Sequence, residues 1–130
     1  MSNVLEKKKL LLVDDQAHVR DLLRELFTDF RVFEARNGQE ALDLLARTTP
    51  DLILLDIDMP VMSGVETFRR MKERESSRSI PVIFLTASNS KEIVEECILQ
   101  GAMSYILKPF DPSDVRKRVS KVMEKLNEGS

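Results

Sequence analysis

Four short apolar runs in this sequence lack the alternation of polar and apolar residues that a half-exposed strand shows. An uninterrupted apolar run of this length is typical of a strand covered on both faces, as in a parallel sheet between layers of helices. A fifth run is weaker and is typical of an edge strand. The four strong runs are residues 10–13, 52–55, 82–85 and 105–107, and the weaker run is residues 31–35. Together they predict a buried parallel sheet.

Segments with helical periodicity lie between these runs. Residues 17–30 place their apolar side chains on one face at helical spacing: Val19, Leu22, Leu23, Leu26, Phe27 and Phe30. Four further helices begin at residues that suit a helix N-terminus: Asn37-Gly38, Ser63-Gly64, Ser90 and Asp111-Pro112. The fourth helix, residues 91–100, is closed by Gly101, which can take a positive φ. Five strands alternating with five helices predict a doubly wound α/β fold with right-handed crossovers.

Composition narrows the class of protein. A chain of 130 residues suits one domain, and a formal net charge of −2 argues against direct nucleic-acid binding. No apolar run approaches the roughly 20 residues of a membrane span, and no signal peptide is evident. The single cysteine, Cys97, allows no internal disulfide, and its apolar neighbours predict a buried thiol. We therefore expect a cytoplasmic single domain that does not bind membranes.

Residues with reactive side chains follow four of the five strands. In an open α/β sheet, sites form outside the carboxyl ends of the strands. The first strand is followed by Asp14-Asp15, the third ends in Asp56 with Asp58 just beyond, the fourth ends in Thr86, and the fifth is followed by Lys108. Each of these is unremarkable alone, because an Asp pair often makes only a turn or a helix cap. Their arrival at one edge of the sheet predicts a site.

The chemistry of such a site follows from its charges. Three carboxylates a few ångströms apart raise one another's pKa unless a cation lies among them. Oxygen ligands suit a hard divalent ion such as Mg²⁺, which also accepts a phosphoryl oxygen as a ligand. The Lys108 amine and the Thr86 hydroxyl then complete an electrostatic clamp for a transferring phosphoryl group. Asp56, at the end of the central strand, is the candidate nucleophile, through an acyl phosphate.

Four motifs resemble those of the receiver domains of bacterial two-component response regulators. They are Val13-Asp14-Asp15, Leu55-Asp56-Ile57-Asp58-Met59-Pro60 with Met62-Ser63-Gly64, Leu85-Thr86-Ala87, and Leu107-Lys108-Pro109-Phe110. The resemblance covers residues 9 to about 126 and implies a single receiver domain over residues 1–130. It further implies a flavodoxin-like sheet with strand order 2-1-3-4-5. It describes a signalling receiver, not an enzyme, that catalyses only its own phosphorylation and dephosphorylation.

The resemblance also implies roles for individual residues. Asp56 would accept a phosphoryl group from a phosphohistidine on a histidine kinase or a histidine phosphotransfer protein. Mg²⁺ would be bound directly by Asp15 and Asp56, through water by Asp14, and by the backbone carbonyl of Asp58. Thr86 and Lys108 would bind phosphoryl oxygens, with a cis peptide bond between Lys108 and Pro109. Tyr105 matches the aromatic switch residue that turns inward when Thr86 moves toward the phosphoryl group.

Some positions bear on regulation. The turn at residues 101–104 lacks the paired acids of receivers that dimerise as winged-helix transcription factors do. The chain is instead similar to stand-alone receivers of the chemotaxis type, which bind a downstream protein on the helix 4–strand 5–helix 5 face. Asp58 is acidic where many relatives are neutral, and Ser88 lies two residues after Thr86. The resemblance implies that these two residues set the lifetime of the acyl phosphate.

Three alternatives remain open. The Asp-x-Asp of Asp56 and Asp58 also resembles phosphatases of the haloacid dehalogenase type, although those carry the motif on the first strand and have a cap insertion. A receiver that only binds partners without being phosphorylated is a second alternative, against which the complete set of acids, hydroxyl and lysine argues. A receiver taken from a larger regulator is the third. A flavin site is disfavoured because Asp14-Asp15 would repel the phosphate.

Overall fold

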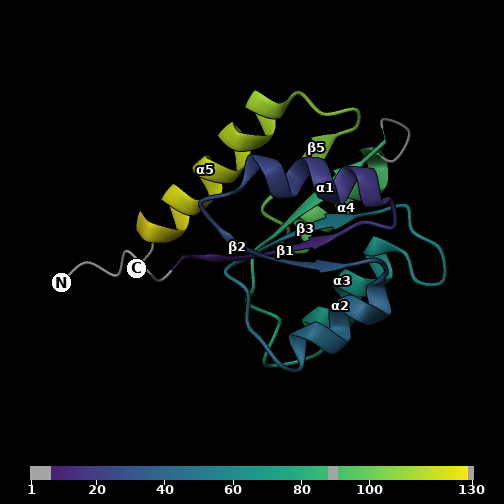
Figure 1. Cartoon of the computed structure of the whole chain (residues 1–130). Helices are drawn as coiled ribbons and strands as arrows, with labels where there is room; N and C mark the ends of the chain where they lie inside the picture. The colour runs from purple at the N-terminus through teal and green to yellow at the C-terminus, as the bar shows by residue number, and fades with distance from the viewer. Residues whose placement is uncertain (1–6, 88–90, 129–130) are drawn as a thin grey trace.

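A computed structural model describes residues 7–87 and 91–128 of this protein. Its centre is a parallel sheet of five strands in the order β2-β1-β3-β4-β5, flanked by helices (Figure 1). The strands are β1 (Lys9–Val13), β2 (Arg31–Ala35), β3 (Leu52–Asp56), β4 (Val82–Thr86) and β5 (Ser104–Leu107). The helices are α1 (Ala17–Leu26), α2 (Gly38–Leu45), α3 (Gly64–Lys72), α4 (Lys91–Leu99) and α5 (Pro112–Glu128). The doubly wound α/β fold and its strand order are confirmed.

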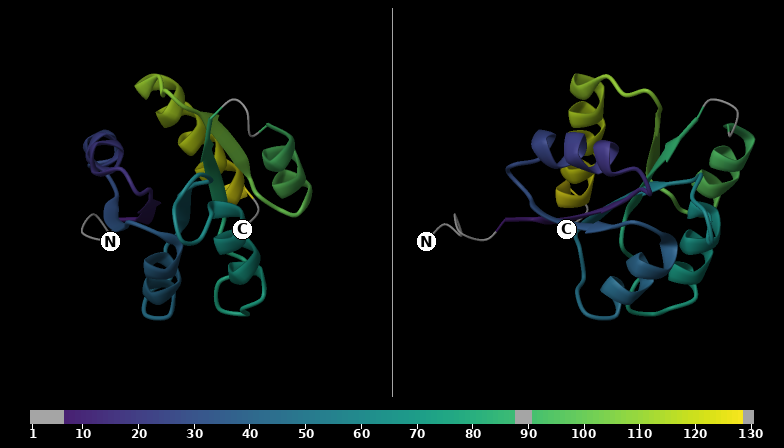
Figure 2. Two further views of the ribbon diagram at one scale, coloured as in Figure 1. Left: turned by 90° about the vertical axis from the view of Figure 1, so that its right-hand side faces the viewer. Right: turned by 45° about the vertical axis from the view of Figure 1, so that its right-hand side comes forward.

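Two apolar layers cover the sheet, one on each face. Helices α1 and α5 pack on one face, and α2, α3 and α4 pack on the other, as Figures 1 and 2 show. Successive residues of one strand enter opposite layers: Leu54 packs toward α1 and α5, whereas Ile53 and Leu55 pack toward the other helices. Every residue of β3 and β4 is buried, which explains why these strands read as uninterrupted apolar runs.

Helix α1 ends earlier than its apolar periodicity predicts. The pattern continues to Phe30, but the helix ends at Leu26, because the chain must reach β2, where the Arg31 amide donates to the Lys8 carbonyl at 2.8 Å. A turn over residues 27–30 still packs both phenylalanines inward, with the Phe27 and Phe30 rings edge to face at 5.6 Å. Leu22, predicted to face inward, is 38% exposed, whereas its neighbour Leu23 is fully buried.

The other helix boundaries follow the predicted signals. Asn37 and Ser63 cap α2 and α3, accepting from the amides of Glu40 and Glu66 at 2.8 and 3.1 Å. Helix α4 ends at Leu99, and Gly101 beyond it has φ +116°. Cys97 is buried, as predicted, whereas the expected cap Ser90 lies outside the described residues. Among the described helices, none combines the length and apolarity needed to cross a membrane.

Candidate functional site

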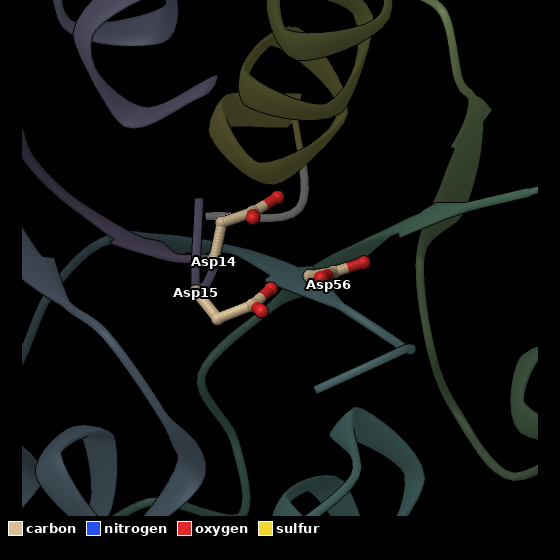
Figure 3. Close-up of side chains that lie close together, drawn as sticks. All are labelled: Asp14, Asp15 and Asp56. Carbon is tan, nitrogen blue, oxygen red and sulfur yellow. The ribbon is translucent and has the colours of Figure 1, made fainter. Parts of the chain in front are cut away.

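Three carboxylates meet where β1 and β3 end. Parallel pairing sets Val13 opposite Leu55, so the residues that follow them emerge side by side. Oxygen atoms from Asp14, Asp15 and Asp56 all lie within 4.8 Å of one another, and Figure 3 shows the Asp15 side chain reaching toward Asp56. The three carboxylates therefore lie together, as predicted from strand ends that are far apart in the sequence. The register of the sheet produces this arrangement.

Asp14 is fully buried and held on every side. Its backbone amide donates to the Ala35 carbonyl of β2 at 3.2 Å. One carboxylate oxygen, Oδ1, accepts from the Gln16 amide at 2.9 Å, and the other, Oδ2, accepts from Lys108 Nζ at 2.8 Å. Both oxygens of Asp14 thus already have partners within the protein, so this carboxylate is held in place before any ion binds.

Asp56 is almost fully buried, with 1% of its surface exposed. Burial, together with the nearby charge of Asp14, raises the pKa of the Asp56 carboxyl to about 6, against the opposing effect of Lys108. Its Oδ1 lies 3.2 Å from Lys108 Nζ and accepts a long hydrogen bond of 3.3 Å from the Asp58 amide. Its Oδ2 has no hydrogen-bond partner among residues 7–87 and 91–128. One oxygen is therefore available for chemistry.

Lys108 and Thr86 reach the same edge from β5 and β4. The two strands pair Thr86 with Leu107, and the Lys108 amide donates to the Thr86 carbonyl at 2.8 Å. Burial would lower the pKa of the Lys108 amine, but its hydrogen bond to Asp14 and the charges of Asp14 and Asp56 outweigh that effect and raise the pKa. The peptide bond to Pro109 is cis, as the resemblance implies. The buried Thr86 hydroxyl donates to the Ala87 carbonyl at 2.9 Å.

Three further predicted residues lie outside this cluster. The Asp58 side chain is exposed, although its backbone amide contacts Asp56. Tyr105 is half-buried on β5, with the Arg118 guanidinium over its ring, 5.9 Å from the centroid. Ser88 lies outside the described residues. The structure thus gathers Asp14, Asp15, Asp56, Thr86 and Lys108. Tyr105 is paired with Phe84, two residue pairs along the β4–β5 ladder from the pair of Thr86 and Leu107.

Gly64 lets the next helix approach the end of β3. Its amide donates to the Ile57 carbonyl at 2.9 Å. A Cβ at Gly64 would lie 2.1 Å from the Asp56 carbonyl oxygen, a distance that the backbone could accommodate only by moving. Sequence analysis interpreted this glycine as part of a helix start and included it in the receiver-like motif that follows Asp56. Its closeness to Asp56 depends on the fold and has no signal in the sequence.

Sequence analysis also missed a polar network behind the carboxylates. Arg20 Nη1 donates to the Asp14 carbonyl at 2.7 Å, and Arg20 Nε donates to Glu34 at 3.1 Å. One signal was present, since Glu34 is an acid in the interior of the run 31–35, where a half-buried charge needs a partner. The carbonyl contact had no such signal, because any residue supplies a carbonyl.

The carboxylate cluster fits a small divalent cation. All of its side-chain donors are oxygens, which Mg²⁺ prefers. Asp15 has no hydrogen bond or ion pair within the described part of the chain, and Asp56 keeps one oxygen unpartnered. The two oxygens of Asp14 are engaged by Gln16 and Lys108, which leaves that residue suited to an outer position. The cluster therefore offers carboxylate oxygens of Asp15 and Asp56 that have no partner within the described part of the chain.

Known proteins resemble this chain over most of its length. The family model for the response regulator receiver domain matches residues 10–120. Sporulation initiation phosphotransferase F of Bacillus subtilis is 39% identical, over 89% of this chain and 94% of that protein. Chemotaxis protein CheY of Halobacterium salinarum is 36% identical, over 89% of this chain and 97% of that protein. The crystal structure of chemotaxis response regulator CheY4 of Vibrio cholerae superposes with a TM-score of 0.83 at 30% identity, covering 90% of this chain and 99% of that one.

Proposed function

Because this chain belongs to the response regulator receiver family of two-component signalling, we propose that Asp56 is the residue that accepts the phosphoryl group. The observation that carries this assignment is the position of Asp56. It is a buried carboxylate at the end of the central strand, with Lys108 Nζ 3.2 Å from one oxygen and no partner on the other among the described residues. Receivers are signalling modules, and the only chemistry that we assign to this one is its own phosphorylation and dephosphorylation.

The proposed reaction is a phosphoryl transfer between two side chains. One oxygen of the Asp56 carboxylate forms a bond to phosphorus as the phosphorus–nitrogen bond of a donor phosphohistidine breaks, and the electron pair of that bond stays on the imidazole nitrogen. Lys108 stabilises the charge on the transferring oxygens, since its ammonium is already held between Asp14 and Asp56 at 2.8 and 3.2 Å. The donor is a histidine kinase or a histidine phosphotransfer protein.

We assign the residues around a bound Mg²⁺ from the state of their oxygens. Asp15 and Asp56 would bind the ion directly, Asp14 through water, and Asp58 by its backbone carbonyl. The Asp58 amide already contacts Asp56, so this part of the backbone lies against the acceptor carboxylate. When bound, the ion supplies positive charge against the incoming phosphoryl oxygens. The protein's contribution is to hold three acids together at the edge of its sheet.

The response to phosphorylation would run through Thr86 and Tyr105. The Thr86 hydroxyl would leave the Ala87 carbonyl for a phosphoryl oxygen, and Tyr105 would then turn inward. The face formed by α4, β5 and α5 would bind the downstream protein. Of the elements that form this face, α4 carries Leu99 and β5 carries Leu107, apolar side chains that are 88 and 48% exposed. Asp58 and Ser88 would set the lifetime of the acyl phosphate.

Mass spectrometry of the phosphorylated protein tests the assignment. The chain is incubated with Mg²⁺ and acetyl phosphate, and the site of modification is located in the wild type, in Asp56→Asn and in Asp58→Asn. We expect one phosphoryl adduct in the wild type and in Asp58→Asn, and none in Asp56→Asn. An adduct of equal yield in Asp56→Asn would overturn the assignment. Sustained release of phosphate from small phosphomonoesters would instead favour the haloacid dehalogenase alternative. The described residues contain no cap insertion of the kind that those phosphatases carry.

A further inference from the structure

Arg20 on α1 is a charged side chain placed behind the carboxylates. Only 13% of its side chain is exposed, which is unusual for an arginine on a helix that otherwise presents charged residues to water. Its guanidinium makes two hydrogen bonds in different directions, to the Asp14 carbonyl at 2.7 Å and to Glu34 on β2 at 3.1 Å. Glu34 is in turn held by Arg24 at 2.5 Å. The network therefore ties α1 and β2 to the backbone that follows β1.

The position of Asp15 depends on that backbone. Asp15 is exposed, and its side chain has no hydrogen bond or ion pair to any residue that the structure describes. Nothing on the side chain itself directs it toward Asp56. The Asp14 carbonyl belongs to the peptide unit that leads into Asp15, so the rotation of that unit sets the direction in which the Asp15 side chain leaves the backbone. Arg20 is the only described group that donates to this carbonyl.

We propose that Arg20 is a positioning residue that orients Asp15 for cation binding through the Asp14 carbonyl. The inference rests on the proposed function, in which this site binds Mg²⁺. It adds that a residue with no contact to the ion sets the affinity of the site. Removal of a residue that orients a metal ligand typically lowers metal affinity by roughly tenfold or more.

The direction in which Mg²⁺ affinity changes when Arg20 is replaced distinguishes a positioning role from a simple effect of its charge. A guanidinium close to a cation site repels the cation, so its neutralisation should strengthen Mg²⁺ binding if charge were all that mattered. Loss of orientation has the opposite effect, since Asp15 would sample directions away from Asp56. A neutral substitution of Arg20 therefore weakens binding under the positioning role and strengthens it under the electrostatic one.

Isothermal titration of Mg²⁺ into the metal-free protein, at fixed ionic strength, tests the inference. We expect roughly tenfold weaker binding in Arg20→Gln, by analogy with other residues that orient metal ligands. Arg24→Gln is the matched control, because it removes the same charge from the same helix and from the same Glu34 partner without touching the Asp14 carbonyl. Its affinity should stay within about twofold of the wild type. Urea unfolding without Mg²⁺ measures any purely structural loss separately.

Each outcome decides a different point. A wild type that binds no Mg²⁺ would contradict the proposed function itself. A wild type that binds, together with Arg20→Gln that binds equally well or more tightly, would overturn the role of Arg20 alone. If Arg20→Gln does not fold, Arg20→Lys tests the inference instead. Lysine keeps the positive charge, but its ammonium cannot reproduce the two hydrogen bonds that the guanidinium makes to the Asp14 carbonyl and to Glu34. We then expect weaker binding than in the wild type, and unchanged affinity would contradict the inference.

Discussion

At the scale of single residues, the Asp56 carboxylate is both the proposed reactive group and a cost to the fold. It is buried beside the Asp14 carboxylate, and one lysine serves both acids at 2.8 and 3.2 Å. A carboxyl whose pKa is raised in the folded protein favours its protonated form there. Ionised Asp56 therefore lowers the stability of the metal-free protein, and a bound cation or phosphoryl group changes that balance.

This conflict predicts how the stability of the metal-free protein depends on pH. The pKa of Asp56 is about 6 in the folded protein and 3.8 as an ordinary carboxyl, so its contribution is fully present below pH 3.8 and is lost as the pH rises through 6. The loss is on the order of 3 kcal/mol in the free energy of unfolding. Urea unfolding at several pH values, in the presence of a chelator, measures it.

Two substitutions isolate the contribution of Asp56 to that profile. Asp56→Asn cannot ionise, so its stability should change less between pH 4 and pH 6 and should exceed that of the wild type at neutral pH. Asp43→Asn, at an exposed carboxylate on α2, removes the same charge and should leave the profile unchanged. A wild-type profile that is retained in Asp56→Asn would show that burial of this carboxyl does not control the stability.

Sequence analysis could predict which side chains meet at the site, but not the contacts that hold them in place. The meeting of Asp14, Asp56 and Lys108 was predictable because each residue lies at or just after the carboxyl end of a strand. Parallel strands bring their carboxyl ends to one edge of the sheet. Arg20 and Gly64 act on backbone atoms, the Asp14 and Asp56 carbonyls. Contacts to carbonyls leave no pattern of residue types, and so these two contacts emerged only from the structure, although Gly64 itself belongs to a predicted helix start and to the receiver-like motif.

At the scale of elements, α5 contacts the side chain proposed to switch. Arg118 places its guanidinium over the Tyr105 ring at 5.9 Å and donates to the Tyr105 carbonyl at 3.1 Å. It also lies 3.4 Å from the Asp114 carboxylate on the same helix. Arg118 therefore contacts both the ring and the backbone of Tyr105. This pairing of α5 with β5 favours the half-buried position in which the structure shows the ring.

Loss of Arg118 should release Tyr105. A cation over an aromatic ring contributes about 0.5–1 kcal/mol at such a site, which changes the ratio of two ring positions by roughly two- to fivefold. The chain has one tyrosine and no tryptophan, so its intrinsic fluorescence reports on Tyr105 alone. We expect Arg118→Ala to change the emission and its quenching by acrylamide in the unphosphorylated protein.

A lysine on the same helix provides the control for that measurement. Lys121 is exposed and has no described partner, so Lys121→Ala removes the same charge from α5 without touching the ring. Its Tyr105 fluorescence should match that of the wild type. Equal fluorescence in Arg118→Ala, Lys121→Ala and the wild type would show that Arg118 does not determine the position of the ring.

Helix and strand boundaries were predictable where local chemistry sets them. Asn37, Ser63 and Gly101 act within a turn of their own helices, and each is found where the sequence places a cap or a stop. The end of α1 was not predictable in this way. Phe27 and Phe30 continue the apolar period, but the path to β2 ends the helix at Leu26, and the two rings reach the core from a turn instead.

At the scale of the whole molecule, the strand order of the sheet brings segments that are distant in the sequence to one site. Strands β1 and β3 are neighbours in the middle of the sheet, and β4 and β5 follow on one side. Asp14, Asp56 and Lys108 therefore meet although Asp14 and Lys108 are 94 residues apart. The strand order was predicted from the resemblance, because alternating strands and helices alone predict a doubly wound sheet without specifying which strands are neighbours.

Cation binding should therefore stabilise the molecule as a whole, because the ligands belong to separate strands that unfolding would disperse. An ion that binds only the folded state raises the free energy of unfolding by about 1.4 kcal/mol at ten times its dissociation constant. Thermal unfolding followed by circular dichroism over a series of Mg²⁺ concentrations measures this gain, with sodium chloride adjusted to hold ionic strength constant. The logarithmic rise should disappear in Asp15→Asn, which keeps the buried acids intact but removes an exposed donor. An undiminished rise in Asp15→Asn would mean that the stabilising ion binds elsewhere, and an equal rise with sodium alone would reduce the effect to general screening.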